Sequence, residues 1–98
     1  AEVLPEIANA VAGRVKILVD GGIREGIDIL KMLALGADAV MIGRPICIAA
    51  FGAAQEGVEF YLDQKRSELK KAMILTGCPD INHIDPSVIV RDSKGQVC

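Results

Sequence analysis

The sequence is poor in the residue types on which many catalytic and metal sites depend. Its 98 residues include no tryptophan, one tyrosine, one histidine and three cysteines. The cysteines are odd in number and lack C-x-x-C spacing, so reduced thiols in a cytoplasmic protein explain them better than disulfides or a metal site. No Ser/His/Asp set can be recognised. We therefore expect no metal ligands and no catalytic triad, and we expect His83 to be solvated or bonded locally.

The sequence also lacks a strong charge of either sign and a long apolar run. Its formal net charge is −2, without a basic run or an acidic tail. Binding to nucleic acid or to a membrane surface through bulk electrostatics is therefore not expected. The apolar stretches are far shorter than the roughly 20 residues of a membrane-spanning helix. What the chain does have is an apolar content of 51%, which requires a buried core.

The chain is organised around the stretch from Lys16 to Pro45. Two short apolar runs, Ile17–Val19 and Ala39–Ile42, are each soon followed by glycine and arginine, and a segment of helical periodicity separates them. Runs that are apolar on both faces are typical of strands in a parallel sheet, and a crossover helix must join such strands. Both glycine-arginine sites are therefore expected at the C-terminal edge of the sheet, where parallel sheets bind ligands.

The remaining pattern predicts mainly helices. We expect strands over Val15–Val19 and Ala39–Ile42, and helices over Glu2–Ala12, Gly26–Leu35, Ile46–Ala54 and Glu56–Thr76. In the last helix, Tyr61 falls on the apolar stripe and the charged residues should form a solvated face. Cys47 and Cys78 are expected to be buried. Prolines and turn formers beyond Cys78 predict docked loops, and residues 92–98 are expected to be mobile.

Two parallel strands do not make a self-sufficient sheet. Each would leave unpaired edge groups and uncovered apolar faces, whereas a (β/α)₈ barrel needs about 250 residues and eight βα units. The sequence also begins without methionine. We therefore expect residues 1–98 to be a partial domain, a piece of a larger protein that pairs with something else to be stable.

The two glycine-arginine loops have the parts that a phosphate site needs. In residues 20–24 (DGGIR), glycines let backbone N–H groups approach an oxyanion and Arg24 adds a planar cation. Gly43 and Arg44 offer a second such approach, and the segment that follows can aim a helix N-terminus at the same anion. Other interpretations stay open: a glycine turn without a ligand, surface arginines, and Asp20 as a cap for the next helix.

Three segments resemble the FMN-dependent α-hydroxy acid oxidases and dehydrogenases, such as glycolate oxidase and lactate oxidase. They are DGGIR at 20–24, ALGADAVMIGRP at 34–45 and MILTGC at 73–78. The resemblance runs from Glu2 to about Val90. It implies an α/β fold that forms the C-terminal quarter of a TIM (β/α)₈ barrel: helix six, strands and helices seven and eight.

The resemblance also implies a cofactor and its ligands. Members of that family bind FMN through these loops, so Asp20 would bond the ribityl chain, Gly22 and Arg24 would contact the phosphate end, and Gly43 with Arg44 would clamp the phosphate. Gly21 belongs to the same cofactor-binding loop. The intact enzyme would oxidise a small L-2-hydroxy acid to the 2-oxo acid. Its catalytic histidine and substrate-binding arginine belong to an S-N-H-G-x-R motif upstream of this chain. No catalytic residue is therefore expected here, and the chain alone should be inactive.

Two alternatives remain open. The chain could be a non-catalytic, self-associating FMN- or phosphate-binding module. It could also come from another FMN barrel enzyme, similar to type 2 isopentenyl diphosphate isomerase or to inosine monophosphate dehydrogenase, because these share the DGG-x-R pattern. A homo-oligomer, or association with the missing part of the barrel, is expected in either case.

Overall fold

A computed structural model describes residues 2–91, and the tail predicted to be mobile, 92–98, lies outside the described residues. The elements in chain order are α1 (Leu4–Val11), β1 (Leu18–Asp20), α2 (Gly26–Ala34), β2 (Ala39–Met41), α3 (Arg44–Thr76) and the 3₁₀ turn η1 (Pro86–Val88). Within residues 2–91, no helix is long and apolar enough to cross a membrane.

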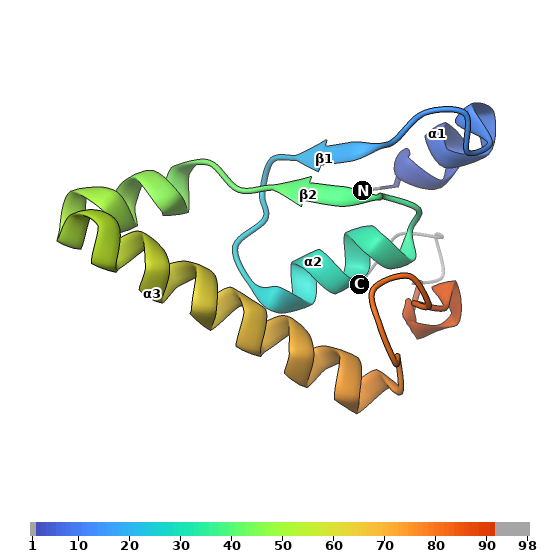
Figure 1. Cartoon of the computed structure of the whole chain (residues 1–98). Coiled ribbons are helices and arrows are strands. Elements are labelled where there is room, and N and C mark those ends of the chain that lie inside the picture. The colour runs from blue at the N-terminus through green and yellow to red at the C-terminus, as the bar shows by residue number, and fades with distance from the viewer. Residues whose placement is uncertain (1, 92–98) are drawn as a thin grey trace.

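The two strands pair in parallel, with α2 as the crossover between them, which confirms the predicted β-loop-α-β unit. Leu18 is opposite Ala39 and Asp20 is opposite Met41. Figure 1 shows both arrowheads at the same end of the sheet, so the two following loops leave from one edge. The predicted start of the first strand, Val15, was wrong. In this register Val15 would face Gly36, where the chain is still leaving α2, so no strand is available to pair with it.

The helix predictions hold, with one refinement. The chain from Arg44 to Thr76 is assigned as one helix, but Ala53 and Ala54 have non-helical dihedrals that divide α3 into two arms. The arms correspond to the two predicted helices. The first arm leaves the sheet edge and the second runs beneath α2 (Figure 1). Gly77, with φ of +78°, ends the second arm as predicted, because glycine accepts the left-handed conformation.

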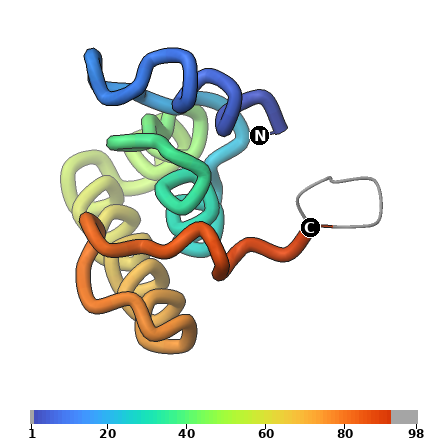
Figure 2. The backbone as a smooth tube through the Cα atoms, turned by 90° about the vertical axis from the view of Figure 1, so that its right-hand side faces the viewer, coloured from blue at the N-terminus to red at the C-terminus, as the bar shows by residue number. Residues whose placement is uncertain are grey.

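A small core lies between α1, the sheet and α2. Leu4, Leu35 and Ala37 are buried there, and partly buried Ile17, Val19, Met32 and Ile89 pack against them. Ile89 packs against this core and η1 contacts α2, and Figure 2 shows the tail running back past α2, so the predicted docking of the tail is confirmed. On the other side of α2, the backbone of α3 lies against Gly26.

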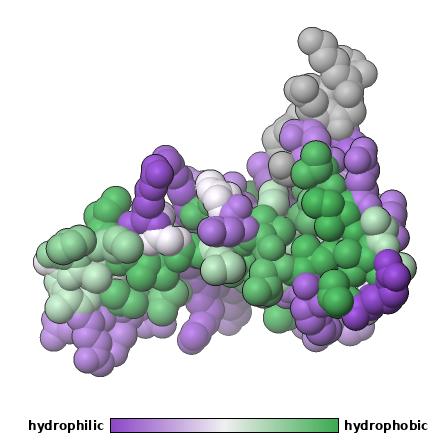
Figure 3. Space-filling view, turned by 90° about the horizontal axis from the view of Figure 1, so that it is seen from above, coloured by the Kyte–Doolittle hydropathy of each residue, from purple (hydrophilic) through white to green (hydrophobic). Residues whose placement is uncertain are grey.

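The strands are not buried on both faces within these residues. Leu18 is 61% exposed and Met41 is 50% exposed, because no other element covers that side of the sheet. Figure 3 shows a broad apolar surface on the side of the molecule opposite the long arm of α3. Exposed apolar residues gathered on one face and bordered by polar ones, as seen there, are typical of a contact region.

Candidate functional site

The structure brings all six sequence-predicted site residues to one hollow at the C-terminal edge of the sheet. The hollow has a volume of about 450 Å³, and its lining is contributed by the two loops that follow the strands. It is lined by Asp20, Gly21, Gly22, Ile23, Arg24, Met41, Gly43, Arg44 and Pro45. The shared edge follows directly from the parallel register, which sets Asp20 beside Met41.

The backbone of the loop after β1, residues 20–24, borders the hollow. Gly21 and Gly22 have φ of +99° and +72°, and a Cβ built at either position would find no atom within 4 Å. L-residues rarely adopt such φ values, so glycine is required by the backbone itself. The buried side chain of Ile23, 5% exposed, anchors the loop to the core immediately before Arg24. The loop thus offers open space at a backbone that an oxyanion can approach.

The two arginines are the cations of this hollow. Both are exposed, and within residues 2–91 neither guanidinium group forms an ion pair or a hydrogen bond. A single exposed arginine would mean little. Two guanidinium groups without a partner among residues 2–91, on adjacent loops of one hollow, are the arrangement that recognition of an anion requires.

The helices that begin at this edge differ in how their N-termini are satisfied. At α2, Glu25 is the N-cap and forms a capping box with Asp28, which also excludes the alternative that Asp20 caps this helix. At α3, the N-cap is Gly43, which supplies no side-chain cap. No side chain therefore caps the start of α3, where Gly43, Arg44 and Pro45 line the hollow. Pro45 has no N–H and the Ile46 N–H bonds Gly43 O, so the Arg44 N–H is the donor that the first turn offers.

The histidine and the two described cysteines do not line the loop hollow. His83 bonds Asp80 locally at 2.8 Å on the exposed tail, as predicted, and the bond from His83 holds the pKa of the Asp80 carboxyl below its ordinary value. Among the described residues there is no cluster of side chains that could hold a metal ion. Cys78 is half-buried, but Cys47 is exposed, so its predicted burial was wrong. The first arm of α3 carries it away from the core.

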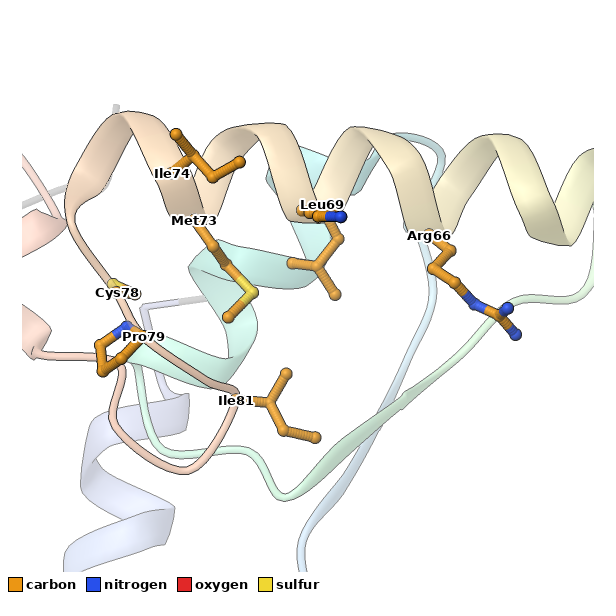
Figure 4. Close-up of a pocket in the computed structure, with 8 residues that line it drawn as sticks. Arg66, Leu69, Met73, Ile74, Cys78, Pro79 and Ile81 are labelled. Carbon is orange, nitrogen blue, oxygen red and sulfur yellow. The ribbon is translucent and has the colours of Figure 1, made fainter.

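A second hollow, of about 310 Å³, lies between the end of α3 and the tail. Figure 4 shows Leu69 and Met73 from α3 and Ile81 from the tail around it. Its lining is mostly apolar, with Arg66 and Lys70 as its charged members. Unlike the loop hollow, it is not bordered by loops that follow the strands of the sheet.

Sequence reasoning missed one pair of charges. Lys65 was expected on a solvated face, but it is 9% exposed and its Nζ lies 2.8 Å from Glu68 Oε2. The hydrogen bond from Lys65 is the main reason that the pKa of Glu68 is lowered. Lys65 also lies over the ring of Tyr61, 4.9 Å from its centroid, and the buried Tyr61 hydroxyl has no hydrogen-bond partner within residues 2–91. Nothing in the helical periodicity distinguishes this pair from the other charges of α3.

Comparison with known proteins gives one consistent family. The sequence profile of the FMN-dependent dehydrogenases matches residues 1–91. An L-lactate dehydrogenase of Haemophilus influenzae is 49% identical over 94 residues, which are 96% of this chain and 25% of that protein. A peroxisomal (S)-2-hydroxyacid oxidase of Arabidopsis thaliana is 45% identical over 82 residues, 84% of this chain and 23% of that protein.

Solved structures agree with the sequence matches. A crystal structure of mandelate oxidase with benzoyl-formic acid superposes with a TM-score of 0.84 at 46% identity, covering 87% of this chain and 25% of that one. Another structure of mandelate oxidase, a variant, contains an FMN adduct. The chain thus spans about a quarter of the length of the relatives that it matches.

Proposed function

This chain belongs to the family of FMN-dependent dehydrogenases, and from that premise we propose that it is the cofactor-gripping part of a barrel enzyme that oxidises a small L-2-hydroxy acid to the 2-oxo acid. The observation that carries the proposal is the single hollow in which both glycine-arginine loops meet. When bound, FMN supplies the hydride acceptor for this class of reaction.

The residues of the hollow fit a phosphate with a polyol chain attached. The guanidinium groups of Arg24 and Arg44 would bind the phosphate, and the start of α3, where Gly43 supplies no side-chain cap, would add the backbone N–H of Arg44. The segment Gly21-Gly22 would let the cofactor approach the backbone closely. Asp20, at the end of β1, would accept hydrogen bonds from the ribityl hydroxyls. The space around all three glycines is open, so nothing in the chain itself competes for it.

The groups that act on the substrate are proposed to lie outside these residues. The one histidine of the chain, His83, is on the exposed tail and pairs with Asp80, so it cannot take a proton in the hollow. The general base and the substrate-binding arginine would come from other barrel units. The chain by itself would then bind cofactor without turning over substrate.

Replacing Arg44 tests this assignment. In the intact protein that carries this chain, Arg44→Ala should weaken FMN binding about 10- to 150-fold, because a hydrogen bond to a charged group contributes about 1.5–3 kcal/mol. The readout is flavin fluorescence during titration of the cofactor-free protein. Arg66→Ala is the matched control, since Arg66 is equally exposed but lies on α3 beside Asp63, away from the loop hollow. Unchanged FMN affinity in Arg44→Ala would refute the proposed contact between Arg44 and the FMN phosphate.

The uncovered apolar face favours a partner for this chain. We propose that the partner is the rest of the same barrel, because Leu18 and Met41 leave one face of the sheet uncovered and the two-stranded sheet leaves both of its edges unpaired within residues 2–91. Self-association of the isolated chain is the competing proposal. Size-exclusion chromatography with light scattering separates them: a stable dimer of the isolated chain would favour the self-associating module. A cytoplasmic location stays a prediction, because one relative is named as peroxisomal.

A further inference from the structure

The pair formed by buried Lys65 and half-buried Glu68 on α3 contacts the first residue of α2. Glu68 Oε1 accepts a hydrogen bond from the backbone N–H of Gly26 at 3.2 Å, across 42 residues of sequence. The same carboxylate accepts Lys65 Nζ at 2.8 and 3.1 Å. A carboxylate at a helix N-terminus is stabilised by the helix dipole, and a half-buried one needs a cation beside it. Glu68 therefore has two partners with different functions: Lys65 balances its charge, and Gly26 ties it to α2.

Gly26 is held at that place by more than the hydrogen bond. A Cβ at Gly26 would overlap the backbone N of Leu69 and would lie 2.5 Å from the backbone C of Glu68. The two helices therefore touch backbone to backbone at this point. Because such contacts cannot be relieved by a change of rotamer, α3 and the first residue of α2 move together.

The two residues before Gly26 are fixed by a second carboxylate. Asp28 Oδ2 accepts the backbone N–H groups of Arg24 at 3.2 Å and of Glu25 at 3.1 Å. Three consecutive N–H groups, those of residues 24–26, are thus held by Asp28 within the helix and by Glu68 from outside it. Only the glycine pair 21–22 and Ile23 separate this fixed segment from the end of β1.

We propose that Glu68 is a positioning residue that fixes the loop 20–25 in the geometry with which it grips phosphate, with Lys65 present to keep Glu68 charged and in place. The proposal rests on the proposed function for its ligand. Without the bond to Glu68, the N–H of Gly26 would lose its acceptor, and the loop would retain Asp28, Ile23 and the backbone contact at Gly26 as anchors beyond two flexible glycines. A smaller fraction of molecules would then have Arg24 in the position that binds the phosphate. The apparent affinity for FMN falls in proportion to that fraction.

A matched pair of double variants isolates the hydrogen bond. Lys65→Met/Glu68→Gln and Lys65→Met/Glu68→Leu both remove the two charges, but only the first keeps an oxygen that can accept the Gly26 N–H. In the intact protein, at a temperature where both are folded, FMN should bind the leucine variant about tenfold more weakly than the glutamine variant. Backbone amide exchange of residues 24–26 in the cofactor-free protein should be faster in the leucine variant by a similar factor. Glu59→Gln, an exposed change on the same helix, should alter neither.

The outcomes separate this inference from the proposed function. If the two double variants bind FMN equally and exchange residues 24–26 at equal rates, Glu68 contributes stability only and the inference is wrong. If the unaltered protein does not bind FMN, the proposed function fails, and the amide exchange comparison still decides whether Glu68 orders the loop. Loss of a purely structural residue would also lower the melting temperature. The test of Glu68 as a positioning residue is therefore the comparison of FMN affinity and amide exchange between the two double variants.

Discussion

The contact between α2 and α3 at Gly26 gives the sharpest stability prediction. Gly26→Ala would place a Cβ 2.5 Å from the backbone C and the Cβ of Glu68, whereas ordinary contact starts at 3.4 Å. The second arm of α3 must therefore retreat by about 1 Å, since backbone atoms cannot move aside alone. The Gly26 N–H···Glu68 Oε1 bond, already 3.2 Å long, would then exceed hydrogen-bond length.

The magnitude follows from three terms. Overpacking of this kind costs about 1–3 kcal/mol, and the lost hydrogen bond to a carboxylate costs about 1.5–3 kcal/mol. The better helix propensity of alanine returns up to about 1 kcal/mol. Because the first two terms describe one displacement, they do not add in full, and we expect a net loss of about 2–4 kcal/mol.

Urea unfolding of the intact protein measures this loss as a lower midpoint at an unchanged slope. Gly52→Ala is the control, because Gly52 is also in a helix and a Cβ there meets no atom within 4 Å. It should be neutral or stabilising by up to about 1 kcal/mol. A Gly26→Ala protein as stable as the parent would show that the two helices do not touch as the structure has them.

Three further predictions are independent of that contact. Leu30→Ala should lower the free energy of unfolding by about 2–5 kcal/mol, measured by urea unfolding, because Leu30 is 2% exposed and its removal leaves a cavity. Gly43→Ala should weaken FMN binding in fluorescence titrations while leaving the unfolding midpoint nearly unchanged, because a Cβ there enters only the open hollow; equal affinity would place the phosphate elsewhere. His83→Ala should raise the pKa of Asp80 toward its ordinary value in an NMR titration, because the bond from His83 is the main cause of its lowering. The sign follows: the pair stabilises the fold above the ordinary Asp pKa, and that stabilisation is lost as pH falls through the lowered pKa. An unchanged titration would show that the pair does not form.

Most of the candidate site could be predicted because its residues are close in sequence to the strands that carry them. A strand that is apolar on both faces indicates a parallel sheet, and a parallel sheet places the loops that follow its strands at one edge. That rule was enough to place loop 20–24 beside Gly43 and Arg44. The division of α3 at Ala53 and Ala54 was also visible, since the small-residue segment and the amphipathic segment differ in pattern.

Errors arose where a residue's environment depends on a distant element. Val15 is apolar and near a strand, but the register set by Ala39 leaves it without a partner. Cysteine is a residue type that is usually buried, but Cys47 lies on the first arm of α3 and is exposed. Lys65 has the pattern of a solvated charge, but the crossing with α2 buries it.

The sequence by itself determined the family, the β-loop-α-β unit and six of the residues that line the hollow, because each depends on local pattern and on short motifs whose glycines have a backbone requirement. The tertiary structure alone decided which carboxylate supports the loop. Glu68 and Gly26 are 42 residues apart, and their bond exists only because α2 and α3 cross backbone to backbone at a glycine. Helix periodicity predicts the face of a helix on which a charged side chain lies. Whether that side chain is buried depends on the helix that packs against that face.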